Sequence, residues 1–102
     1  MKEAERRTEL IRKAVESVIS HYKVDRFYSG EIEKLIDEVS DSIVKTVGVD
    51  TEVDVNNVAN HAYIGANLIL DPLEHAGSLK LNSHHLSRYI ASAVISEFIL
   101  KM

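Results

Sequence analysis

Residues 86–102 read LSRYIASAVISEFILKM, a helix-length segment with three charged side chains and apolar residues on two sides. Helical spacing gives two apolar stripes on nearly opposite sides of this segment: Leu86, Ile90, Ala93 and Leu100 in the first, and Ala91, Ile95, Phe98 and Met102 in the second. A surface helix normally carries one apolar stripe, which faces its core. Two stripes therefore predict two partners for this helix, the core of the chain and a second contact.

Glu97 is the residue that discriminates between the two stripes, because it falls in the middle of the first one. If that stripe faces the core, the carboxylate needs a partner such as Arg88 or Lys101, since burying it alone is costly. If the stripe faces outward, the second stripe forms the core, and we favour this arrangement. It predicts a homodimer with a two-fold interface formed by Leu86, Tyr89, Ile90, Ala93, Glu97 and Leu100.

Apolar residues recur at helical spacing in three further segments, so the sequence predicts an all-α bundle of four main helices at about 3–22, 30–47, 54–70 and 83–101. Short connections predict that successive helices are antiparallel neighbours. Ser29 is the expected N-cap of the second helix and Gly48 its expected stop. Either Asn82 or Ser83 is expected to cap the last helix.

The third predicted helix carries three alanines and Gly65 on its apolar side, which predicts close approach of another helix. The sequence Asp71-Pro72-Leu73-Glu74 then resembles the start of a new helix, because proline is favoured at the first helical position. We therefore expect the third helix to end near Leu70 and a separate helical turn to occupy residues 72–76, ending at Gly77.

Residues 47–55 alternate valine or threonine with polar residues or glycine, which is the period of a half-buried strand. We expect a short extended segment at 48–53. The alternative is a loop followed by a capping box from Thr51 to Asp54. A strand needs a partner, and either residues 78–81 or a second copy of the chain could supply one.

The chain has 102 residues, of which 45% are hydrophobic, and it is expected to form a single helical domain over residues 1–102. It contains no cysteine, which excludes disulfides and thiolate catalysis. The charged start MKEAERRTE does not resemble a signal peptide, and no apolar run is long enough for a membrane span. We expect a soluble, cytoplasmic protein that does not associate with membranes.

Charge is unevenly distributed along the chain, whose net charge is −4. The segment 29–57 has eight acidic and two basic residues. This concentration predicts an acidic surface for a basic partner, with solubility as the competing explanation. The proposed surface consists of Asp37, Glu38, Asp41, Asp50 and Glu52.

The segment 21–28 interleaves basic and aromatic residues, a mixture that can bind phosphates and stack on bases. With the basic first helix it predicts a nucleic-acid contact formed by Arg6, Arg7, Lys23, Arg26 and Tyr28. The alternative is that Tyr22 and Phe27 fill the core between two helices while the charged side chains face water.

Catalytic and metal sites are not indicated. His84 and His85 are adjacent, so on a helix they point about 100° apart and cannot easily share one ion, although His61 and His75 could join one of them. The sequence has no G-x-S-x-G elbow and no glycine-rich phosphate loop. We therefore expect no cofactor, no metal and no enzymatic activity.

The expected function is a self-associating protein that acts through protein–protein contacts as a regulatory, accessory or inhibitor-like factor. The alternative is a nucleic-acid-binding regulator.

Overall fold

Four α-helices and one 3₁₀ turn make up most of the described chain, residues 2–48 and 55–101 of a computed structural model, with side chains described for 5–48 and 56–99. The elements are α1 (Lys2–His21), the 3₁₀ turn η1 (Val24–Arg26), α2 (Ile32–Val47), α3 (Val55–His75) and α4 (Ser83–Lys101). The predicted all-α bundle of four helices is confirmed.

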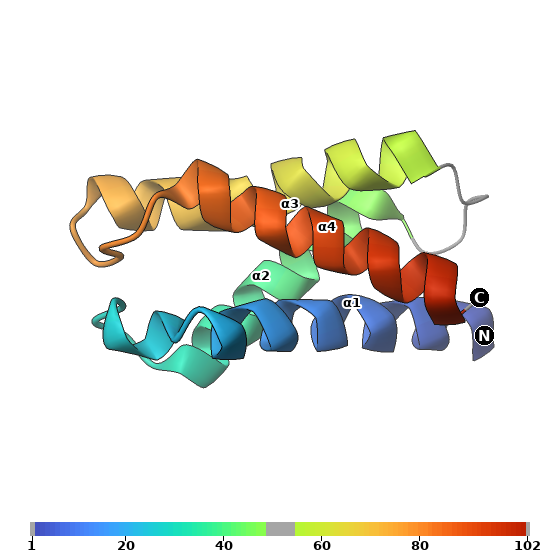
Figure 1. The fold of residues 1–102 in the computed structure, drawn as a ribbon, viewed down its shortest axis with the longest axis horizontal. Helices are drawn as coiled ribbons and strands as arrows, with labels where there is room; N and C mark the ends of the chain where they lie inside the picture. The colour runs from blue at the N-terminus through green and yellow to red at the C-terminus, as the bar shows by residue number, and fades with distance from the viewer. Residues whose placement is uncertain (1, 49–54, 102) are drawn as a thin grey trace.

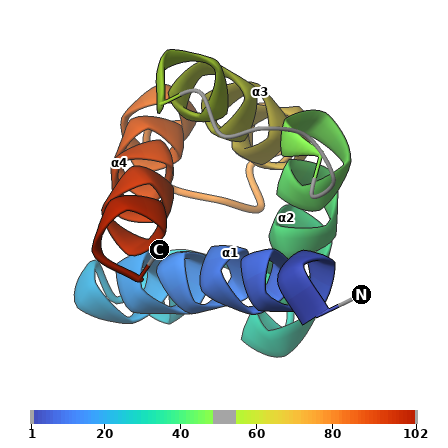
Figure 2. The same cartoon turned by 90° about the vertical axis from the view of Figure 1, so that its right-hand side faces the viewer.

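The helices run alternately in opposite directions, so that the two ends of the chain lie at the same end of the bundle (Figure 1). Viewed along its length, the bundle is a square in which each helix contacts two neighbours: α1 packs on α2 and α4, and α3 packs on α2 and α4 (Figure 2). Diagonally opposite helices therefore meet only through the side chains that fill the centre.

The core is a single cluster to which every helix contributes fully buried aliphatic side chains. Val24 adds to it from η1, where Lys23 adopts a left-handed conformation with φ of 52° and turns the chain inward. The completely buried residues of the helices include Ile11 and Val15, Leu35, Val39 and Ile43, Ala62, Ala66 and Leu70, and Ile90 and Val94.

α3 continues unbroken through Pro72 to His75, so the predicted end near Leu70 and the separate turn at 72–76 are wrong. Proline in the last turn of a helix costs one hydrogen bond, that to the carbonyl of Leu68, but its fixed φ is helical. Buried Leu70 and half-buried Leu73 extend the inward face across it, and this packing favours continuation.

Gly77, which we expected to end a separate turn, instead ends α3 in a Schellman motif. Its φ is 80°, its N–H donates to the carbonyl of Glu74 (3.0 Å), and the N–H of Ser78 donates to the carbonyl of Leu73 (2.9 Å). Gly48 likewise ends α2, with φ of 75° and its N–H on the carbonyl of Val44.

Ser29 does not cap α2, because it belongs to a contact between the two loops at one end of the bundle. The N–H of Ser29 donates to the carbonyl of Ser78 (2.9 Å), and the N–H of Lys80 donates to the carbonyl of Phe27 (2.8 Å). The segment 78–81, considered as a partner for an extended segment at 48–53, therefore pairs with residues 27–29 instead. Residues 49–54 lie outside the described part of the chain.

α3 approaches α2 closely at Gly65, as the position of this residue among alanines predicts. A Cβ atom there would lie 2.8 Å from the Cα of Ile43. Two side chains of α2 bond to backbone carbonyls of α3 beside it: Ser42 Oγ donates to Gly65 and Thr46 Oγ1 donates to His61, each at 2.7 Å.

Candidate interaction surfaces

The two apolar stripes of α4 face two neighbours in the same chain, α1 on one side and α3 on the other. Leu86 and Ile90, which we assigned to a subunit interface, are 3% and 0% exposed and belong to the core. Fully buried Val94 lies between the stripes, so the core runs along their inner edges. The predicted interface is therefore wrong for Leu86 and Ile90, because a second copy could reach them only if the bundle opened.

Tyr89 and Ala93, which we also assigned to that interface, lie along the boundary between α4 and α1. Tyr89 is exposed and stacks on Tyr22, the residue that follows α1, with ring centroids 4.6 Å apart. Ala93 is half-buried in a hollow beside Val18. Glu97 is also half-buried, and its Oε2 is shielded from solvent without a hydrogen-bond partner. The side chain of Leu100 lies outside the described residues.

A groove of about 690 Å³ opens between the N-terminal half of α3 and the middle of α4. The two helices diverge from each other toward the end of the bundle that carries the chain termini (Figure 1). Small side chains leave room for the groove, which is lined by Ala59, Asn60, Tyr63, Arg88, Ala91 and Ile95 among others. Most of its exposed lining area is apolar, although Asn56, Asn60 and Ser92 are polar and Arg88 is the one charged side chain among the described lining residues.

An aliphatic pair lies beside this groove on the outer side of α3. Ile64 is 41% exposed and Leu68 is 60% exposed, and the two are one helical turn apart. Tyr63 lines both the groove and a second hollow of about 240 Å³ that Ile64 and Leu68 border. The pair and the groove therefore form one continuous surface. Sequence reasoning missed it, although both residues fall outside the inward stripe of α3 on a helical wheel.

Polar side chains hold the opposite halves of α3 and α4 together. Fully buried Ser87 donates to Asn67 Oδ1 (3.3 Å), and fully buried Ser83 donates through Oγ to Asp71 Oδ1 (3.3 Å). The backbone N–H of Ser83 donates to Glu74 Oε1 (2.7 Å). This bond is the main cause that lowers the pKa of Glu74, because it stabilises the carboxylate at the start of α4.

The first turn of α4 is capped by Asn82, one of the two predicted residues, whose Oδ1 accepts the N–H of His85 (2.9 Å). A side-chain hydrogen bond between Tyr63 and His84 also joins α3 to α4. At the end of α3, His75 donates through Nδ1 to the carbonyl of Asp71 (3.0 Å), and this bond is the first cause that raises the pKa of His75.

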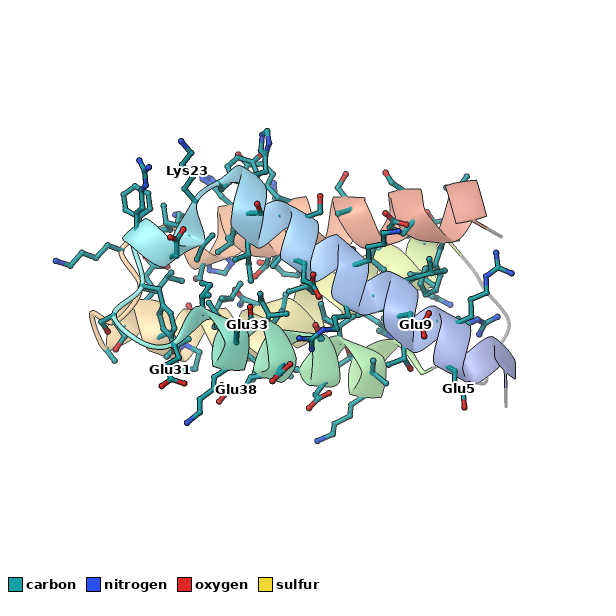
Figure 3. All side chains as sticks on the ribbon, turned by 90° about the horizontal axis from the view of Figure 1, so that it is seen from below. Glu5, Glu9, Lys23, Glu31, Glu33 and Glu38 are labelled. Atoms are coloured by element: carbon teal, nitrogen blue, oxygen red, sulfur yellow. The ribbon has the colours of Figure 1, made fainter. Side chains whose placement is uncertain are left out.

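The predicted acidic surface is only partly assembled. Asp37 is hydrogen-bonded to Arg12 of α1, which also lies 3.8 Å from a carboxylate oxygen of Glu33, so part of the negative charge is neutralised. Glu38 and Asp41 are exposed on α2, and Figure 3 shows Glu33 and Glu38 along this helix. Asp50 and Glu52 lie outside the described residues.

The predicted nucleic-acid residues do not form one surface. Arg7 is buried, and the 14 helical steps from it to His21 span about 21 Å of α1. Arg6 is exposed at the same far end, whereas Lys23 and Arg26 are exposed at the loop end. Tyr28 is half-buried and its ring covers Gly30, while Tyr22 and Phe27, the proposed core fillers, are exposed instead.

Residues 2–48 and 55–101 contain no helix with the length and hydropathy of a membrane span. Within the same ranges, no three histidine or acidic side chains are placed to hold a metal ion. No protein-family model, characterised protein sequence or solved structure shows significant similarity to this chain.

Proposed function

We propose that this protein is a non-enzymatic helical module that self-associates through the surface shared by α3 and α4. The exposed pair Ile64 and Leu68 of one copy would occupy the α3–α4 groove of a second copy, and the reverse contact would form by symmetry. The observation that carries the proposal is the position of this exposed aliphatic pair directly beside a mainly apolar groove.

Symmetry supports a second copy as the occupant. A two-fold contact requires a surface that is complementary to itself, and a projecting element next to a hollow meets this requirement. Tyr63, which borders both the groove and the aliphatic pair, would lie near the two-fold axis.

Energetics indicate a modest affinity. Completing the burial of Ile64 and Leu68 contributes about 1 kcal/mol for each side chain, because both are already partly buried in the monomer. Four such side chains and the groove walls have to offset an association cost of at least about 4 kcal/mol. The four side chains alone only about balance this cost, so the groove walls have to supply the net affinity, and we expect a weak dimer with a dissociation constant on the order of millimolar.

Analytical ultracentrifugation over a concentration series tests the proposal. Wild-type protein should change from monomer to dimer as its concentration rises. Leu68→Glu removes the projecting pair and Ala59→Trp fills the groove, so each variant alone should stay monomeric. A mixture of the two variants should recover a weaker dimer, because one copy keeps an intact groove and the other keeps an intact pair.

Ile99→Glu is the matched control, since Ile99 is 59% exposed on α4 and lines neither hollow. This variant should dimerise like wild type, and circular dichroism should show every variant folded. Wild-type protein that remains monomeric at the highest concentration would rule out self-association. If Ile99→Glu abolishes the dimer and Leu68→Glu does not, the dimer contact lies outside the α3–α4 groove and the Ile64–Leu68 pair.

A further inference from the structure

Basic and aromatic side chains gather at the end of the bundle that carries the loop after α1 and the loop after α3. The bond from the N–H of Lys80 to the carbonyl of Phe27 places Lys80 beside the η1 loop, although 53 positions separate the two residues in sequence. This contact adds a third basic residue to Lys23 and Arg26. We call the three cations and the exposed rings of Tyr22 and Phe27 the basic tip.

The cations of the basic tip are available to a ligand. Lys23, Arg26 and Lys80 are all exposed, and none takes part in an ion pair with another described residue. Asp25 is the single acidic residue of η1. Figure 3 shows Glu31, the next acidic residue, on the opposite side of the bundle end from Lys23. The tip is thus locally positive in a protein whose net charge is −4.

The aromatic rings of the tip are exposed where side chains of their kind are normally covered. Phe27 is 42% exposed and has no polar group that favours contact with water. Tyr22 stacks almost parallel on Tyr89 and makes an edge contact with His21. A hollow of about 200 Å³ beside this stack is bordered by Leu81 and His85.

We propose that the basic tip binds single-stranded nucleic acid, with a base stacked on Phe27 and backbone phosphates on Lys23, Arg26 and Lys80. Unpaired bases offer the flat faces that an exposed ring can cover, whereas bases within a duplex are already stacked on each other. A ligand recognised by charge alone, such as an acidic peptide, would gain nothing from Phe27. The inference does not depend on self-association, because every residue of the basic tip lies outside the α3–α4 groove and the Ile64–Leu68 pair.

Fluorescence anisotropy with labelled oligothymidylate and oligouridylate of about 12 nucleotides tests this inference at low salt. We expect binding with a slope of log K against log[salt] of about −2, as three phosphate contacts to a single strand predict. A duplex of the same length should bind more weakly. The two oligonucleotides distinguish a DNA from an RNA ligand, and tight binding of either supports the inference.

Variants separate stacking from charge. Phe27→Ala should weaken binding about tenfold with an unchanged salt slope, because it removes one stacked base. Lys80→Ala should weaken binding and reduce the slope by about 0.7. Lys45→Ala is the matched control: Lys45 is exposed in the last turn of α2, so its loss changes net charge equally without touching the tip.

Four results would overturn the inference: no binding at low salt, equal losses for Lys45→Ala and Lys80→Ala, an unchanged affinity in Phe27→Ala, or binding to anionic phospholipid vesicles without binding to oligonucleotides. Leu68→Glu should bind oligonucleotide like wild type if the tip acts alone. Loss of self-association and loss of nucleic-acid binding would then be distinguished by separate variants.

Discussion

Replacing Gly65 by alanine tests the close packing of α2 against α3. The new Cβ would lie 2.8 Å from the Cα of Ile43 and 3.0 Å from the carbonyl oxygen of Ser42. Ordinary contact begins near 3.4 Å, so one helix has to move by about 0.6 Å. The nearest obstructing atom, Thr46 Oγ1, could rotate away only by giving up its bond to the carbonyl of His61. The other two obstructing atoms belong to the backbone, and therefore side-chain rotation alone cannot relieve the contact.

Two effects of opposite sign set the magnitude. Alanine in a helix interior is favoured over glycine by about 1 kcal/mol. Overpacking against backbone costs up to about 3 kcal/mol, and a shift of α3 also weakens the bonds that Ser42 and Thr46 make to its carbonyls. We expect Gly65→Ala to reduce the free energy of unfolding by about 2 kcal/mol, which lowers the melting temperature by roughly 10 °C.

Urea unfolding followed by circular dichroism measures this difference. Asn60→Ala is the control, because Asn60 is exposed on the same helix and lines the α3–α4 groove instead of facing α2. At a protein concentration that keeps the chain monomeric, its replacement changes helix propensity alone. That control should gain up to about 0.7 kcal/mol. If Gly65→Ala is stabilised as much as Asn60→Ala, the helices do not approach each other as closely as described.

Three further changes have defined outcomes. Gly77→Ala places a side chain at φ of 80° and should cost about 1 kcal/mol in urea unfolding; a neutral result would contradict the left-handed conformation. Lys23→Gly should instead raise stability by up to about 1 kcal/mol, since it relieves the left-handed conformation at φ of 52°. Because the pKa of Glu74 is lowered in the folded state, its contribution to stability is present above the ordinary glutamate pKa and lost as pH falls through the lowered value. Between about pH 5 and pH 3, the free energy of unfolding should therefore depend less on pH in Glu74→Gln than in wild type. Identical pH profiles of the two proteins would show that the bond from Ser83 to Glu74 is not formed.

Helix positions could be predicted from sequence because apolar periodicity is a local property. The wheel of α4 also correctly indicated two apolar directions. It could not identify the element on each side, and both partners belong to this chain. Glu97 was misleading for the same reason: it is half-buried one turn from fully buried Val94, so a charged residue in a stripe did not mean that the stripe faces solvent.

The surfaces depend on contacts between distant residues, and sequence spacing does not encode these. Lys23 and Arg26 were identified because they lie near aromatic residues in the chain. Lys80 was missed because it reaches them only through a backbone bond to Phe27. Pro72 gave a wrong helix boundary because proline is favoured at the start of a helix. Packing of Leu70 and Leu73 into the core instead extends α3 across it.

The unequal contact between α3 and α4 has a consequence for motion. Hydrogen bonds from Ser83 and Ser87 join the two helices near the loop end, whereas small side chains separate them around the groove. The two helices are therefore joined by hydrogen bonds at one end of their contact and packed through small side chains at the other. We therefore expect α3 and α4 to separate more easily around the groove than near the loop end. An occupant of the groove could then be accommodated by a local change in helix separation, with the hydrogen-bonded end of the helix pair left in place.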